Sequence, residues 1–342
     1  DWIRVSLAGG LANFPLVDRL GNQVLGSQID YNGQGAGYTL DPQEIINYCA
    51  AHDNETFFDA VQLKVPVPTA NSDRVRVQNI ANDLIALGQG VPFFHAGQDM
   101  LRSKSMDRDS YNSGDWFNRL DFTYTWNNWG GGLPVASKNQ DNWPLMQPLL
   151  ADTALQVNPF DIEAATEHFR EMMRIRKSSG LFRLPSEVAV IERVGFLNTG
   201  PAQIPGMIVM TLADDDGSVD RLRQRIVVLF NATDDPQLFA APSLAAYNFD
   251  LHEVQQASSD PVVVTSTWDG DTSTFAVPAR TTAVFVSLRA AEDQIDLVIE
   301  DIAELVADGV LNSGQGNALT VKLENALAKI ARGQTLSLIH IS

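Results

Sequence analysis

Short continuous apolar runs alternate with a stretch of helical spacing in the first third of the chain. Residues 45–49 and 91–94 are such runs, and each predicts a short buried strand. Residues 71–73 offer N-cap chemistry for a helix that ends at the Gly-Gln-Gly of residues 88–90. The apolar positions between them keep near-helical spacing and are Val75, Val77, Ile80, Ala81, Leu84 and Leu87. Strand, helix and strand in this order indicate a parallel sheet, and a (β/α) barrel is the leading candidate.

The remaining polar and apolar pattern divides the chain further. Residues 1–40 are rich in Gly, Asn and Asp and predict irregular loop, and a long polar loop follows over residues 98–152. Residues 161–178 have one apolar face and predict another helix. From residue 181 to residue 289, short runs rich in Val and Ile are separated by turns, which is typical of an antiparallel β-sandwich. The predicted strands there are residues 189–194, 206–212, 225–230, 262–267 and 282–288.

Two apolar-periodic helices over residues 290–334 predict a helical hairpin whose connecting turn lies at residues 309–316. Residues 335–342 fit no domain pattern, and we interpret them as a non-native tail. The predicted domains are therefore residues 1–180, 181–289 and 290–334, followed by that tail. The chain opens at Asp1 inside an already patterned segment, and we expect the natural N-terminus to lie upstream.

Composition narrows the class of protein. Hydrophobic residues make up 44% of the 342 residues and charged residues 19%, so sizeable cores are expected. The formal net charge of −18 argues against a nucleic-acid partner, because neutralising phosphates needs clustered Lys and Arg. No apolar run approaches the roughly 20 residues of a membrane-spanning helix. Cys49 is the only cysteine, so neither an intrachain disulfide nor a structural zinc site of several cysteines is available.

The sharpest candidate for chemistry is His52-Asp53-Asn54, directly after a predicted buried strand. In a (β/α) barrel the carboxyl ends of the strands face the active site. A carboxylate beside an imidazole at that position suits an oxocarbenium-like transition state, in which positive charge develops on a sugar ring. A structural alternative stays open, since Asp or Asn after a strand is often a helix cap.

A second candidate is the loop over residues 101–119, which mixes Asp, Asn, Arg, Tyr and Trp side chains. These side chains hydrogen-bond hydroxyl groups and stack on sugar faces, and more of them follow at residues 126–129 and 141–143. A long loop of this kind is usually functional, although a solvated loop with paired charges explains the composition equally well. Calcium also stays open as a ligand, but the spacing does not match an EF-hand.

These same residues resemble a known family. Residues 48–56 (YCAAHDNET) resemble the fourth signature region of the α-amylase superfamily in its pullulanase and limit-dextrinase form. Residues 101–105 (LRSKS) and 108–118 (RDSYNSGDWFN) look like the stretch after the eighth barrel strand of those starch-debranching enzymes. Residues 29–33 and 181–184 also fit. The resemblance covers about residues 1–289 and looks closest to the limit-dextrinase branch shared by plants and some bacteria.

The resemblance implies a fold and a reaction. The fold is the C-terminal part of a (β/α)8 TIM barrel, followed by an antiparallel β-sandwich and a helical hairpin. The reaction is retaining hydrolysis of α-1,6-glucosidic bonds in pullulan, amylopectin or limit dextrin, without a required cofactor. Asp53 matches the transition-state stabiliser and His52 the sugar-binding histidine of the −1 subsite. The positions that match the lining of the substrate cleft are Asn54, Arg108, Asp109 and Asp141.

Two further expectations follow. The nucleophile and the acid/base would lie on earlier barrel strands, so we expect the 342 residues alone to be inactive and poorly soluble at their exposed strand edges. A non-catalytic α-glucan-binding module is the alternative. The turn of the hairpin resembles modules appended to secreted bacterial hydrolases, which favours an extracellular or periplasmic location; a plant source would imply a plastid.

Overall fold

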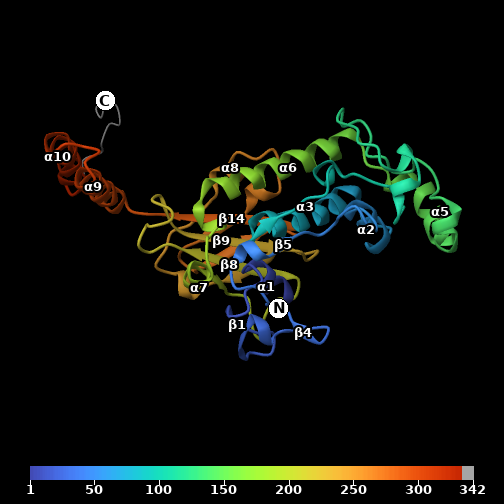
Figure 1. Cartoon of the computed structure of the whole chain (residues 1–342), viewed down its shortest axis with the longest axis horizontal. Helices are drawn as coiled ribbons and strands as arrows, with labels where there is room; N and C mark the ends of the chain where they lie inside the picture. The colour runs from blue at the N-terminus through green and yellow to red at the C-terminus, as the bar shows by residue number, and fades with distance from the viewer. Residues whose placement is uncertain (333–342) are drawn as a thin grey trace.

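A computed structural model describes residues 1–332 of the chain. Figure 1 shows an elongated molecule with β-sheets at its centre and helices α3 (Asn71–Leu87) and α6 (Pro159–Ser178) lying across them. Helix α5 (Trp143–Ala151) lies at one end, and helices α9 (Ala291–Ala307) and α10 (Ser313–Ile330) lie at the other. Within the described residues, no helix combines the length and the apolar character that crossing a bilayer requires.

The first 40 residues are more ordered than their composition predicts. Helix α1 (Trp2–Leu7) is followed by the antiparallel pair β1 (Pro15–Val17) and β2 (Gln23–Leu25). A second short pair joins β3 (Asp30–Tyr31) to β4 (Gln34–Gly35). The prediction of irregular loop was wrong here, because buried side chains such as Leu11 and Phe14 anchor the segment in the core.

The predicted strand–helix–strand unit is present. Strands β5 (Ile46–Asn47) and β6 (Val91–Pro92) pair in parallel, with Ile46 opposite Val91, and α2 (Phe57–Lys64) and α3 connect them. In residues 1–332 this pair is not extended into a closed barrel. Helix α3 has Ala70 at its N-cap and no side-chain cap, so the predicted cap at residues 71–73 was wrong.

Helix α6 begins two residues before its predicted start. The side chain of Asn158 accepts a hydrogen bond from the backbone N of Asp161 at 3.1 Å, and Asp161 Oδ2 accepts one from the backbone N of Asn158 at 3.0 Å. This capping box and Pro159 at the first helical position fix the start of the helix.

Two antiparallel sheets follow. The five-stranded sheet has the order β11-β14-β9-β8-β7 and the three-stranded sheet the order β10-β13-β12. Aromatic side chains, including Phe249, Phe275 and Phe285, fill the space between them. The strands are β7 (Val194–Phe196), β8 (Met207–Ala213), β9 (Arg223–Asn231), β10 (Gln237–Ala240), β11 (Asp250–Leu251), β12 (Thr267–Asp269), β13 (Thr274–Val277) and β14 (Thr281–Leu288).

Two of the predicted strands are not strands. Residues 189–194 belong mainly to helix α7 (Glu187–Arg193), because Ser186 caps it by accepting a hydrogen bond from the backbone N of Ala189. Residues 262–267 contain a 3-10 turn (Val263–Thr265), held by a bond from Thr265 Oγ1 to the carbonyl of Val262 at 2.7 Å. Local side-chain hydrogen bonds outcompeted the β-branched composition at both places.

The other face of the five-stranded sheet packs on the helices. Met172 and Ile175 of α6 share one buried cluster with Ile226, Val228 and Val284 of the sheet. The βαβ unit and the antiparallel region are therefore joined by a continuous hydrophobic core rather than by a linker.

The hairpin of α9 and α10 begins directly after β14. Its turn ends at Asn312, which forms a capping box with Gln315, so residues 313–316 are helical rather than part of the predicted turn. A small helix α8 (Glu253–Gln256) and the short α4 (Ala136–Asn139) complete the described helices of the chain. The predicted non-native tail, residues 335–342, lies outside the described residues.

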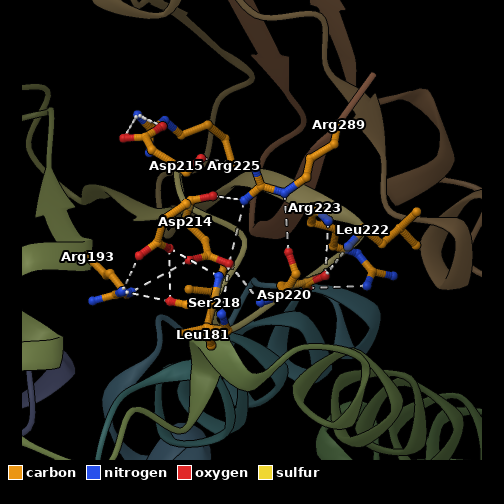
Figure 2. A network of polar contacts seen from close by, with 12 residues as sticks. Leu181, Arg193, Asp214, Asp215, Ser218, Asp220, Leu222, Arg223, Arg225 and Arg289 are labelled. Atoms are coloured by element: carbon orange, nitrogen blue, oxygen red, sulfur yellow. Dashed lines mark hydrogen bonds and ion pairs between the residues drawn. The ribbon is translucent and has the colours of Figure 1, made fainter. Parts of the chain in front are cut away.

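A network of Arg and Asp residues holds the start of the hairpin (Figure 2). Arg289 donates through Nη1 to the carbonyl of Asp215 at 3.0 Å and through Nη2 to the carbonyl of Asp214. Arg223 forms an ion pair with Asp220 at 3.5 Å in the same network. The acidic turn between β8 and β9 is thus neutralised by arginines that belong to the fold.

Candidate functional site

The candidate site lies beyond the carboxyl ends of β5 and β6. Because the two strands are parallel, the segments that follow them leave the sheet at the same edge. The side chains of His52 and Asp53 are 84% and 79% exposed there, and His52 Nδ1 lies 3.1 Å from Asp53 Oδ1. The imidazole and the carboxylate therefore contact each other and face solvent.

The backbone below this pair is held by a buried lysine. Lys104 Nζ donates to the carbonyl of His52 at 2.8 Å, and its own backbone N donates to Asp59 Oδ2 at 2.8 Å. Ser103 Oγ donates to the other oxygen of Asp59 at 2.5 Å. Burial raises the pKa of Asp59 and lowers the pKa of Lys104. The carboxylate in α2 thus fixes the start of the 101–119 loop, and that loop positions His52.

Two more predicted residues meet at this segment. Asn54 has a positive φ of 60°, and its Oδ1 accepts a hydrogen bond from Arg108 Nη2 at 3.2 Å. Arg108 Nε also pairs with Glu55 Oε1 at 3.0 Å. The structure therefore brings Asn54 and Arg108 into contact beside His52 and Asp53.

The other two predicted residues are placed differently. Asp109 is paired with Lys138, whose Nζ lies 3.1 Å from the carboxylate and 2.7 Å from the carbonyl of Asp109. Asp141 lies in a 3-10 turn at Gln140–Asn142. Within residues 1–332, no hydrogen bond or ion pair joins its side chain to the other predicted site residues.

Sequence reasoning missed His95, which follows β6 as His52 follows β5. Its Nε2 lies 3.1 Å from Arg102 Nη1, which also donates to the carbonyl of Ala96 at 2.9 Å. Burial, with the charges of Arg102, Lys104 and His52, lowers the pKa of His95 to about 4. His95 is neutral at pH 7, so its Nε2 accepts from Arg102. His95 directly follows the predicted strand of residues 91–94, and this position in the sequence could have identified it as a candidate.

The loop beyond carries exposed aromatic side chains. A cavity of about 570 Å³ is lined by Gly114, Asp115, Trp116, Asn118 and Arg119, and Trp116 is 65% exposed. The prediction of one long loop over residues 98–152 was wrong, because this segment contains α4, α5 and several 3-10 turns.

This arrangement offers a hydrogen-bonding carboxylate and imidazole together with aromatic faces, which is what a neutral polyhydroxyl ligand requires. Within residues 1–332, no three His, Cys, Asp or Glu side chains are grouped closely enough to hold a metal ion.

Comparison with known proteins gives consistent matches. Residues 124–288 match the family model described as alpha-1,6-glucosidases, pullulanase-type, C-terminal. A chloroplastic pullulanase of Arabidopsis thaliana is 46% identical over 294 residues, which cover 84% of this chain and 30% of that protein. A pullulanase of Klebsiella pneumoniae is 36% identical over 289 residues, covering 83% of this chain and 26% of that protein.

The fold is also similar to a solved structure. Klebsiella pneumoniae pullulanase complexed with maltotriose aligns with a TM-score of 0.80 at 35% identity, covering 84% of this chain and 28% of that chain. The chain thus spans less than a third of the length of these relatives.

Proposed function

Because this chain belongs to the pullulanase family, we propose that it is part of a starch-debranching enzyme that hydrolyses α-1,6-glucosidic bonds. Pullulan, amylopectin and limit dextrin are the proposed substrates. The observation that carries the proposal is the contact between His52 and Asp53 at the exposed carboxyl edge of a parallel strand pair. The similarity to pullulanases over 84% of the chain supports it.

Asp53 is proposed to stabilise the oxocarbenium-like transition state, since a carboxylate gains Coulomb energy as positive charge develops on the sugar ring. His52 donates to a hydroxyl group of the same sugar. Asn54 and Arg108 line the neighbouring subsites, and Asp109 and Asp141 extend the proposed cleft. The nucleophile and the acid/base of the retaining mechanism are proposed to lie outside these 342 residues.

For the fold, we propose that β5 and β6 are the last two strands of a (β/α)8 barrel and that the two antiparallel sheets form its C-terminal β-sandwich. Ile46 and Val91 are 58% and 43% exposed, although both belong to apolar strands. Neighbouring barrel strands would cover such side chains.

A second candidate function, a non-catalytic α-glucan-binding module, is favoured by one observation. The cavity of about 570 Å³ beside Trp116 presents an exposed indole together with Asp115, Asn118 and Arg119, which suits a sugar ring and its hydroxyl groups. For the compartment, the similar proteins include a chloroplastic plant pullulanase and bacterial pullulanases. A plastid and a bacterial extracellular or periplasmic location therefore both stay proposals.

The test uses a polypeptide extended upstream to the length of the relatives, with pullulan as substrate and maltotriose release as the measurement. Asp53→Ala should abolish turnover while leaving the melting temperature nearly unchanged, because the side chain is exposed. Asp271→Ala, which removes an exposed carboxylate from the turn between β12 and β13, is the matched control and should retain full activity. Near-normal turnover by Asp53→Ala would remove the assignment. The 342 residues alone should release no maltotriose.

A further inference from the structure

A second cavity lies in the antiparallel region, where the edge strands of the two sheets meet. Its volume is about 390 Å³, within the range of small-molecule sites. Strand β11 is the last strand of the five-stranded sheet and β12 the last strand of the three-stranded sheet, and both line the cavity. None of its residues belongs to the candidate site at β5 and β6.

The wall of this cavity is an indole held in a fixed orientation. Trp268 is half-buried, and its ring contacts Phe249 edge-on with centroids 5.2 Å apart and Phe275 in a tilted arrangement at 4.3 Å. Phe249, Leu251 and the indole thus present an apolar surface that needs no reorganisation to receive a ligand.

Two buried polar atoms beside that surface have no partner. Among the described residues, Ser266 Oγ and Trp268 Nε1 are buried without a hydrogen bond. A buried polar group without a partner is a hydrogen-bonding position that a hydroxyl group of a ligand can satisfy. Both residues line the cavity, and Ser266 is 95% buried, with a relative exposure of 5%.

The rim decides the chemical class of the ligand. Asp250, Gln256 and Thr267 are exposed there, and Asp250 is the only charged residue that lines the cavity. A single carboxylate repels phosphates and other anions but accepts hydrogen bonds from hydroxyl groups. An added peptide strand is disfavoured, because the carbonyl of Leu251 on β11 already accepts from Gln256 Nε2 at 2.5 Å.

We propose that this cavity is a second carbohydrate site, which binds a short α-1,4-linked glucan segment away from the candidate active site. Sugar rings have an apolar face that packs on indole and hydroxyl groups that pair with Ser266, Thr267 and Asp250. The choice of an α-glucan rests on the proposed function; the geometry itself calls for a neutral polyhydroxyl ligand. Such a site holds a branched polymer near the enzyme and raises its effective concentration at the cleft.

The test is isothermal titration calorimetry of the 342-residue chain with maltohexaose, with cellohexaose as the comparison sugar. Thr267→Arg places a long charged side chain over the cavity from an exposed position and should weaken maltohexaose binding at least tenfold. Trp268→Phe keeps an aromatic ring in the core but removes the indole N–H, and should weaken binding several-fold. Ser259→Arg adds the same charge at an exposed position outside the cavity and should bind as the unmodified chain does.

Asp53→Ala separates this inference from the proposed function. If the cavity is a second site, Thr267→Arg weakens maltohexaose binding in the Asp53→Ala background as it does in the unmodified chain, whatever Asp53→Ala does to hydrolysis in the longer polypeptide. Unchanged binding by Thr267→Arg, loss of its effect in the Asp53→Ala background, equal affinity for cellohexaose, or no heat from a chain that melts cooperatively would each overturn the proposal.

Discussion

The buried histidine His252 predicts a loss of stability in mild acid. It is fully buried between α6 and the five-stranded sheet. Its Nδ1 accepts from the backbone N of Val254 at 3.2 Å, and its Nε2 lies 3.0 Å from Ser178 Oγ. Because Ser178 Oγ donates to the carbonyl of Ile175 at 2.8 Å, it accepts the Nε2 proton of a neutral imidazole. Both of these hydrogen bonds therefore use the neutral tautomer, while Glu253 Oε2, which lies 3.3 Å from Nδ1, favours the protonated ring.

The direction of the effect follows from its pKa. Burial lowers the pKa of His252 to about 4, although the carboxylate of Glu253 acts in the opposite direction. The unfolded chain, with a histidine pKa near 6.5, binds a proton between these values while the folded chain does not. Stability therefore falls as the pH falls from 6.5 to about 4. Between pH 7 and pH 5 this group removes about 2 kcal/mol of unfolding free energy.

The measurement is urea unfolding of the chain and of His252→Gln at several pH values between 5 and 7.5, followed by circular dichroism. The difference between the two curves isolates this residue, and it should shrink by about 2 kcal/mol from pH 7 to pH 5. Parallel curves would refute the reasoning.

His168→Gln is a control of opposite sign. Burial alone would lower the pKa of His168, but the carboxylate of Asp83, 2.8 Å from Nε2, raises this pKa above its usual value. Its stabilisation is therefore present below pH 6.5 and is lost as the pH rises through the raised pKa.

Three other predictions concern stability and solubility. Asp59→Ala leaves a buried hydroxyl and a buried backbone N–H without their acceptor, so the unfolding free energy should fall by about 3–5 kcal/mol in urea titrations. Arg289→Met leaves buried carbonyls of the turn between β8 and β9 unpaired and should lower the unfolding free energy by about 2 kcal/mol. Limited chymotrypsin digestion should then cut faster at the junction with α9. Ile46→Thr reduces the apolar surface of an exposed strand, so size-exclusion chromatography should show a larger monomer fraction; an unchanged fraction would exclude this strand as the source of association.

The sequence predicted long periodic elements well. Helices α6 and α9 begin within two residues of their expected starts, and β8, β9 and β14 coincide with predicted strands. Helix α3 begins inside its predicted cap, and α10 begins at Ser313, inside the predicted turn of residues 309–316. These segments bury one face or both, and the spacing of apolar residues in the sequence reflects which face is buried. The same reasoning placed β5 and β6 in a parallel pair, since two apolar runs joined through a helix rarely pair in any other way.

Local hydrogen bonds explain what the pattern missed. The Ser186 cap turned a Val-rich run into α7, and strands β10, β12 and β13, with three or four residues each, are too short for their alternation to stand out in the sequence. In the site, the resemblance assigned Asn54 and Arg108 to the lining of the substrate cleft. Lys104 stood only within the LRSKS motif, without a role, and Asp59 was not singled out. Both residues bind backbone atoms of other segments, and such contacts leave no recognisable pattern in the sequence.

The shared core also changes how the exposed strand edges should be understood. We had expected poor solubility because two β/α units cannot close a barrel. However, helices α3 and α6 pack on the five-stranded sheet through a cluster that runs from Val5 to Val286, so the βαβ unit is supported from below. The strand pair itself stays exposed at the β5–β6 edge, where Tyr48 and Phe93 are 58% and 47% exposed and contact each other edge-on at 6.1 Å. Association should therefore proceed through this edge between folded molecules, rather than through unfolding of the βαβ unit.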